Sequence, residues 1–280
     1  PSIGVDRPQR ADLANPHYGT GRSDSPLARM RLRHAEGMSL PWRGPANPPI
    51  EVDRLPLFRG LRPLKKWRYL GVYGSDVQMC VGIARIGGGY QAFWAVDNRT
   101  TGAFRERAAM WPIVHFDETS ARFDGVDVTY RRAGDPIEVV TMHGKYPIWT
   151  RKTPVRITGT IDGIDIDSTG LVDESAGHHA RVTRWSWSAG CGTSEDGAAL
   201  TWNLVDGVHD SPTNSERTLW VDGVPQEVGP VEFAADLSRV DNLAPVPVGR
   251  EQARHPRRAF GKLLLDQPCR HLQLALGEPD

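Results

Sequence analysis

The chain has 280 residues, and its 34 basic side chains balance 34 acidic ones. This balance leaves no net charge to draw the chain as a whole to nucleic acid or an anionic membrane, so nucleic acid is not an expected partner. Three cysteines lie far apart, at Cys80, Cys191 and Cys269, which argues against a disulfide framework and predicts a cytoplasmic protein. No apolar run approaches the roughly 20 residues of a membrane-spanning helix.

The first 54 residues contain many prolines and no sustained periodicity. Proline removes a backbone donor from a strand ladder, so residues 1–54 are expected to form an irregular segment that wraps over the body of the protein. A short helix near residues 24–36 fits this stretch, with Asp24 or Ser25 as its N-cap and Pro26 in its first turn.

From Trp67 onward, short β-rich runs are separated by glycine-containing turns, which is typical of antiparallel hairpins. The runs in the first half are 67–73, 77–86, 90–96, 123–132, 137–142 and 155–167. The last run contains Asp162-Gly163 between two alternating arms, which is a strong hairpin signal.

The second half repeats this style. Its runs are 184–190, 198–205, 217–228, with a turn at Asp222-Gly223, and 231–237. If 184–190 is a strand, Trp185 and Trp187 share one face, because side chains alternate along a strand. In the same way Trp202 shares a face with two leucines, while Asn203 points to the opposite face.

These patterns predict an all-β fold of two antiparallel barrel or sandwich modules, at 55–160 and 161–240, after the irregular segment 1–54. Residues 241–280 form a tail with proline interruptions and a basic cluster, and no strand alternation continues into them. A short helix over residues 260–266 is the best local interpretation of the tail.

The stretches "GLVDESAG", "RWSWSAGCG", "LTWNLVDGVHD" and "NSERTLWVDG", within residues 170–223, resemble the DUF2804 family. More distantly they resemble the lipocalin-like carotenoid 1,2-hydratase and AttH-type proteins. The resemblance implies two lipocalin-like modules with a ligand cavity and, for the hydratases, acid-initiated chemistry on isoprenoid alkenes. It places the acid on Asp173, with Glu174 beside it. The proline- and arginine-rich tail departs from the family pattern, in which further strands are expected.

The residues themselves are compatible with this chemistry. Adjacent Asp173 and Glu174 point to opposite faces of a strand, so only one can face a cavity. Beside apolar walls the pKa of a carboxyl group rises, and a neutral acid can protonate an alkene or an enol. His178 and His179 are candidates for orienting the acid or activating water. The alternatives are that Asp173 caps a turn and that both histidines face solvent. A metal site is not expected.

A second set of polar residues surrounds the stretch "NLVDGVHDSPTNSE". It is either a turn-rich loop at a barrel mouth or a rim that orients a ligand whose apolar body lies inside. The candidate ligand-binding residues are Trp185, Trp187, Trp202, Asn203, His209, Asn214, Glu216 and Trp220. The tryptophans Trp185 and Trp187 would stabilise a cation through their ring faces, whereas core or inter-module packing is the favoured interpretation of Trp202 and Trp220.

Two functional hypotheses follow. The first is a carbon–oxygen lyase (a hydratase) or an isomerase that acts on a lipophilic, terpenoid or fatty small molecule without a cofactor. The second is a non-catalytic binder of the same class of ligand. A scaffold with filled cores is a third interpretation, and no particular oligomeric state is indicated.

Overall fold

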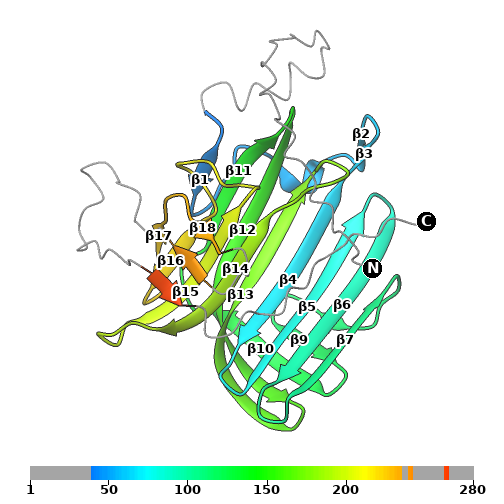
Figure 1. Cartoon of the computed structure of the whole chain (residues 1–280). Coiled ribbons are helices and arrows are strands. Elements are labelled where there is room, and N and C mark those ends of the chain that lie inside the picture. The colour runs from blue at the N-terminus through cyan, green and yellow to red at the C-terminus, as the bar shows by residue number, and fades with distance from the viewer. Residues whose placement is uncertain (1–38, 235–238, 242–261, 265–280) are drawn as a thin grey trace, which may run out of the picture. The chain divides into compact units, whose positions relative to one another are not determined.

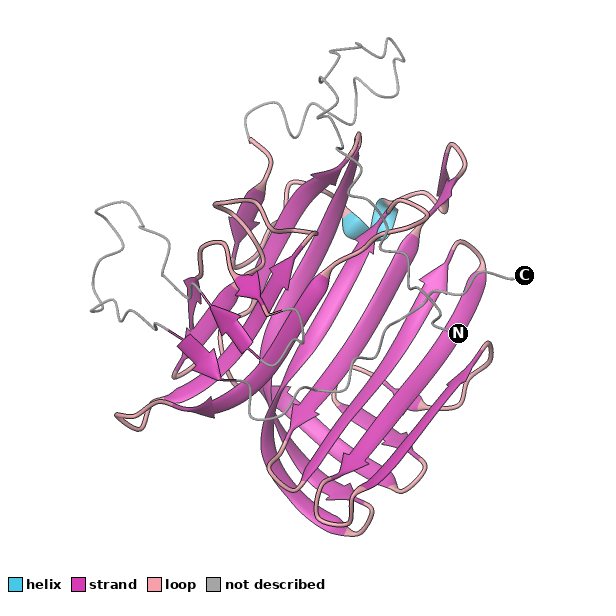
Figure 2. Cartoon of the chain, viewed as in Figure 1, coloured by secondary structure: helices cyan, strands magenta, loops and turns pink. Residues whose placement is uncertain are grey.

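The computed structural model describes residues 39–234, 239–241 and 262–264. Within these residues the protein is almost entirely β, and the one helical element is the short 3-10 helix η1 (Val52–Arg54) (Figure 2). The all-β fold class is therefore confirmed. The helix expected near residues 24–36 lies outside the described residues, as does most of the tail.

The strands form four sheets (Figure 1). The largest has eleven strands: β1 (Trp42–Gly44), β4 (Lys65–Tyr73), β5 (Val77–Ile86), β6 (Gly89–Asn98), β7 (Ala103–Ala109), β8 (His115–Phe116), β9 (Ser120–Phe123), β10 (Val126–Arg132), β11 (Ile137–His143), β12 (Tyr146–Ile161) and β13 (Ile164–Gly177). The smaller sheets contain β14 (Ser186–Thr193), β15 (Ala199–Asp206), β16 (Thr218–Val221) and β17 (Val224–Glu227); β18 (Glu232–Phe233), β19 (Arg239–Asp241) and β20 (Lys262–Leu264); and the hairpin β2 (Phe58–Arg59) with β3 (Arg62–Pro63).

The long strand β12 organises the large sheet. Its first part pairs with β11, its second part pairs with β10, and its opposite edge pairs with β13 along the whole length. The β12–β13 turn is the expected hairpin, because Asp162 and Gly163 have the positive φ angles, 53° and 77°, that such a turn requires. The boundary expected at residues 160 and 161 thus falls inside this sheet, and the chain changes sheet only after Gly177.

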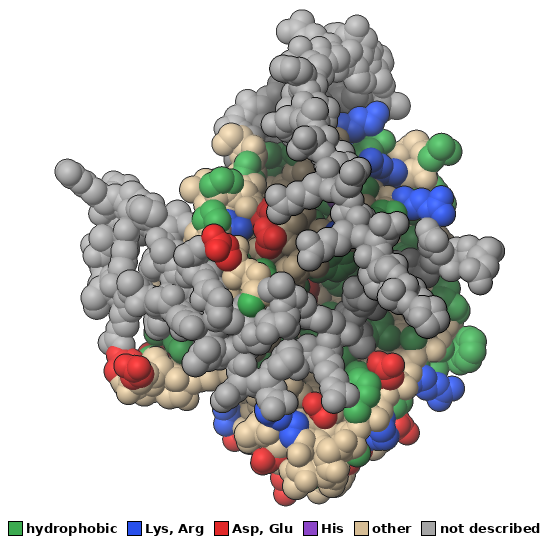
Figure 3. Space-filling model, in the orientation of Figure 1, with side chains coloured by type: hydrophobic (Ala, Val, Ile, Leu, Met, Phe, Trp, Pro, Cys, Tyr) green, Lys and Arg blue, Asp and Glu red, His purple; other side chains and the backbone are tan. Residues whose placement is uncertain are grey.

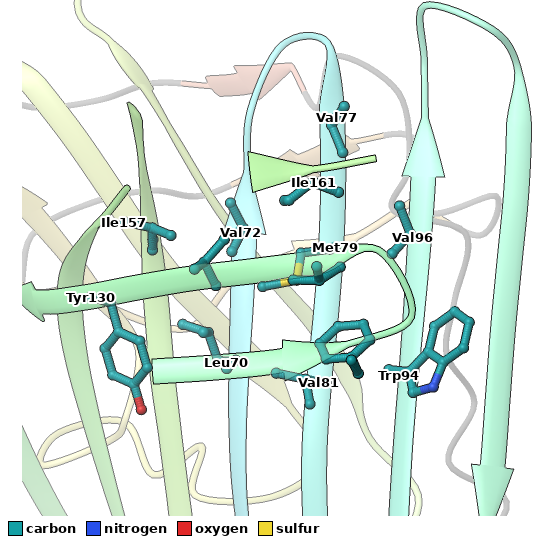
Figure 4. Close-up of a cluster of buried hydrophobic side chains, with 14 of the residues drawn as sticks. Leu70, Val72, Val77, Met79, Val81, Trp94, Val96, Tyr130, Ile157 and Ile161 are labelled. Atoms are coloured by element: carbon teal, nitrogen blue, oxygen red, sulfur yellow. The ribbon is translucent and has the colours of Figure 1, made fainter. Parts of the chain in front are cut away.

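The large sheet curls, so that side chains from both ends of its strand order meet inside the curl (Figure 4). Leu70 and Val72 from β4 pack there with Ile157 from β12 and with Val128 from β10. Alternation puts every second residue of these strands inside, which explains why the runs read as alternating apolar and polar. The inside of the curl is an apolar core.

The sheet β14–β17 packs on the other face of the large sheet. Trp220 of β16 is fully buried against Ile137, Val139 and Leu171, and its indole N–H donates to the carbonyl of Asp135 (2.7 Å). Trp220 is therefore a core residue. The described residues thus form one buried layer inside the curl, a second between the two sheets, and a third apolar cluster in which β15 and β16 pack with Phe233 and Val240.

Two local expectations are wrong. Strand β14 begins at Ser186, so Trp185 precedes it, is 41% exposed and does not share a strand face with Trp187. Residues 262–264 of the tail form strand β20, paired with β19, where a helix was expected. The short apolar run in the tail does not distinguish helix from strand by its periodicity.

Candidate functional site

Asp173 lies in the layer between the two sheets. Its neighbours across the sheet are Lys152 on β12 and Tyr69 on β4, and residues directly opposite one another point to the same face. The ammonium of Lys152 lies 2.6 Å from Asp173 Oδ1. The central strands of the large sheet therefore fix a buried ion pair beneath the sheet β14–β17.

Glu216, in the segment before β16, completes this group. Its Oε2 lies 3.4 Å from Lys152 Nζ, so two carboxyl groups share one ammonium. Burial raises the pKa of Asp173, and the charge of Glu216 adds to this effect, while Lys152 opposes it. Burial lowers the pKa of Lys152, but the two carboxylates outweigh this and raise it overall. The raised pKa makes the neutral, protonated form of Asp173 more accessible than it is for an ordinary aspartate.

Aromatic side chains lie beside Asp173. The side chain of Trp67 forms a hydrogen bond with Asp173. Tyr69 lies directly opposite Asp173 and meets the ring of Trp187 edge to face, with 5.7 Å between ring centroids. The side chain of Asp173 keeps 13% exposure, whereas that of Lys152 keeps 3%. The carboxyl group of Asp173 therefore lies beside aromatic side chains, and it is slightly more exposed than the ammonium.

A chain of hydrogen bonds continues from Glu216 toward β14. The Trp187 indole N–H donates to Asn203 Oδ1 (2.8 Å), and Asn203 Nδ2 donates to the backbone carbonyl of Glu216 (3.0 Å). Asn203 and Glu216 are both buried. The structure thus brings together Asp173, Glu216, Asn203 and Trp187 from the sequence-based candidates.

Glu174 points away from this group. It is half-buried on the opposite face, where Arg151 Nε donates to its Oε2 (2.7 Å) and Arg68 Nη1 lies 3.7 Å from its Oε1. This arrangement agrees with the expected separation of the two adjacent acids. Glu174 forms ion pairs in the structure and does not contact Asp173's partners.

The two adjacent histidines are buried, so the alternative in which they face solvent is wrong. His178 pairs through Nε2 with the carbonyl of Pro56 (2.9 Å). His179 lies over Trp67, with 5.0 Å between ring centroids, and burial lowers its pKa to about 3. His179 is therefore a neutral imidazole one ring away from Asp173.

His209 is a third buried histidine, and it lies near Lys152. Its Nδ1 lies 2.7 Å from Thr141 Oγ1, and burial, together with the charge of Lys152, lowers its pKa to about 3. A cavity of about 210 Å³ opens beside it. The lining residues are Leu40, Pro41, Thr141, Met142, His143, Ile148, Gly207, Val208, His209, Asp210 and Ser211. This cavity is half apolar and is lined by imidazoles, but Asp173 is not part of its wall.

The remaining candidates lie elsewhere. Trp202 is half-buried, donates through Nε1 to Ser188 Oγ (3.1 Å) and packs with the apolar cluster of β15 and β16. Asn214 is a half-buried turn residue with φ 57°, in keeping with the ease with which asparagine adopts this conformation. Trp185 and Trp202 therefore do not belong to the group around Asp173.

Sequence reasoning missed Lys152, Trp67 and Tyr69. All three become neighbours of Asp173 only through the pairing of β4 and β12 with β13. Lys152 itself was a usable signal. It stands between Thr150 and Pro154 at alternate positions of one strand, all three are buried, and lysine is rarely buried without a charged partner.

No group of three or more side chains suited to hold a metal ion occurs in the described part of the chain. Among the same residues, no helix is long and apolar enough to cross a membrane.

The fold and the site define a class of protein: an all-β chain with a buried acid and ammonium group between two antiparallel sheets. Residues 148–247 match the DUF2804 family, which is described as a domain of unknown function. This match confirms the resemblance seen in the sequence, and it spans Lys152, Asp173 and Glu216. No curated protein matches the chain.

Proposed function

We propose that the protein is an acid–base enzyme, a hydratase (a carbon–oxygen lyase) or an isomerase, which protonates a lipophilic small molecule from Asp173. One observation carries the proposal: the buried carboxyl group of Asp173, whose pKa is raised, keeps 13% side-chain exposure beside Trp67 and Tyr69. A neutral carboxylic acid at neutral pH is the form that a proton donor requires.

In this reaction the Asp173 carboxyl group gives its proton to a carbon of a double bond. The positive charge that develops on the substrate lies near Tyr69 and Trp187, whose ring faces attract cations. The carboxylate left on Asp173 pairs with Lys152, 2.6 Å away, which stabilises the product of proton transfer. Water then adds to the substrate cation, or a neighbouring carbon loses a proton. Either step releases a proton that can return to Asp173.

His179 is the candidate that orients the attacking water, while the released proton returns to Asp173. Its imidazole is neutral, since burial lowers its pKa to about 3, and it stacks near Trp67, the hydrogen-bond partner of Asp173. Among the described residues its buried Nε2 has no hydrogen-bond partner. A neutral imidazole with a vacant ring nitrogen can accept a hydrogen bond from water and so orient it.

The test is incorporation of solvent deuterium into a panel of isoprenoid and fatty alkenes incubated with the protein in D₂O. The wild type should label or hydrate at least one compound. Asp173→Asn should abolish labelling and leave the affinity for that compound within about threefold. Glu174→Gln, next in sequence but on the other face, is the matched control and should retain labelling. Labelling that survives Asp173→Asn would overturn the proposal.

A non-catalytic binder is the second candidate, and the cavity of about 210 Å³ beside Thr141 and His209 favours it. Its mixed lining resembles ligand pockets, in which a few polar groups orient an apolar body. This hypothesis predicts that the protein binds a compound of the panel without labelling it. Thr141→Val should then weaken binding, whereas Asp173→Asn should not.

We also propose a cytoplasmic location. In the described residues neither Cys80 nor Cys191 takes part in a disulfide, which suits a reducing compartment.

A further inference from the structure

Most of the large exposed hydrophobic side chains lie at one end of the large sheet. At this end β4 and β12 begin and β5, β7 and β11 end, as their antiparallel pairing requires. The exposed side chains there, which we call the apolar end, are Leu57, Phe58, Leu61, Met110, Trp111 and Met142. Phe104 is the second residue of β7, at the opposite end, and Val224 begins β17 in the other sheet.

The β2–β3 hairpin holds the most prominent part of the apolar end away from the body. Leu61, in its turn, is 101% exposed, so its side chain has no packing role in the described fold. Arg62 anchors the hairpin, since its Nη1 lies 3.3 Å from the carbonyl of His178 and its guanidinium stacks 4.7 Å from the ring of Tyr146. The contacts of Arg62 therefore hold the hairpin so that its tip projects into solvent. Exposure of an apolar side chain to water in this way is unfavourable.

Positive charge surrounds these apolar tips. Among the described residues no carboxylate forms an ion pair with Arg59, Arg85 or Lys145, which lie in the hairpin, at the end of β5 and in the β11–β12 turn. Blue and green side chains lie together at the upper right of Figure 3, near the β2–β3 position of Figure 1. The acids near this end, Glu51 and Asp53, are paired with Arg54 and Lys66.

We propose that the apolar end is a docking surface for anionic phospholipid membranes. Apolar tips on several separate turns suit a soft, laterally adaptable surface, because each tip can enter the headgroup region independently. The unpaired cations would contact lipid phosphates, and this local attraction needs no net charge on the whole chain. The inference is independent of the proposed chemistry at Asp173.

The test uses the full chain and sedimentation with lipid vesicles. The protein should bind vesicles of phosphatidylcholine and phosphatidylserine more tightly than vesicles of phosphatidylcholine alone, and added salt should weaken the binding. Phe58→Ser combined with Leu61→Ser should lower the affinity at least tenfold, roughly the value of two buried apolar side chains. The melting temperature should stay within about 2 °C, because both side chains are exposed.

Phe104→Ser combined with Val224→Ser is the matched control, since these two exposed hydrophobic residues lie away from the apolar end. The control should bind vesicles like the wild type. The proposal is wrong if the wild type binds neither vesicle, or if the control loses as much affinity as the hairpin variant. It is also wrong if the wild type self-associates without binding lipid and the hairpin variant does not, because the occupant would then be a second copy of the chain.

Discussion

Strand β13 lies between two buried layers that differ in chemistry: one is packed with apolar side chains, and the other contains charged groups. Val172 points into the curl and packs among apolar side chains, whereas its neighbour Asp173 points into the layer beneath β14–β17 and pairs with Lys152. The first layer gains stability simply by removing apolar surface from water. In the second layer, removing charged groups from water is unfavourable, and only the attraction between these charges offsets this cost. A buried group of this kind is weak support for stability, so its presence favours a functional role.

The largest effect should come from removing the ammonium that the two acids share. Lys152→Met leaves buried Asp173 without its cation and removes the ammonium paired with Glu216, so it should lower the free energy of unfolding by about 3–5 kcal/mol. Urea denaturation measures this. Arg122→Met is the control, because its ion pair with Asp127 is exposed and should contribute at most about 1 kcal/mol.

Combining Lys152→Met with Asp173→Leu and Glu216→Leu sharpens the comparison. If the group serves chemistry, the triple variant should recover most of the stability that the single variant loses, since apolar replacements of buried charges are often neutral. A triple variant less stable than Lys152→Met would mean that the three side chains contribute to stability through their packing, as the side chains inside the curl do.

The pH dependence of stability should report the neutral histidines of the polar layer. Burial lowers the pKa of His209 to about 3 from its ordinary 6.5, so the unfolded chain binds a proton there that the folded chain does not. The stability that this histidine contributes is complete above pH 6.5 and is lost as the pH falls toward 3. His209→Asn should make the slope of unfolding free energy against pH shallower by about 1.4 kcal/mol per pH unit in that window. An unchanged slope would mean that His209 is already protonated in the folded state.

The smallest effect is expected at the edge of the polar layer. Trp187→Phe keeps the ring beside Tyr69 but removes the N–H that Asn203 Oδ1 accepts, and should cost about 1–3 kcal/mol. Trp185→Phe is the control, because Trp185 is 41% exposed, and should change stability by less than about 0.5 kcal/mol. Equal losses in the two variants would contradict the hydrogen-bond chain described above.

Part of this site could be predicted from residues alone. Alternation along one strand is a local property, so adjacent Asp173 and Glu174 had to separate, and the structure gives them Lys152 and Arg151 as different partners. The same reasoning failed at Trp185, because it needed the strand to begin one residue earlier than it does. Strand ends depend on the neighbouring strand and are not encoded by alternation.

The sequence by itself determined the β class, the hairpins at Asp162-Gly163 and Asp222-Gly223 and the alternation of each strand, because these depend on residues close together in the chain. Only the tertiary structure decided that Lys152, Asp173 and Glu216 meet. It also decided that one edge of β12 pairs first with β11 and then with β10. Such meetings depend on strand order and register, which are fixed by the packing of whole sheets. No local pattern of side chains specifies them.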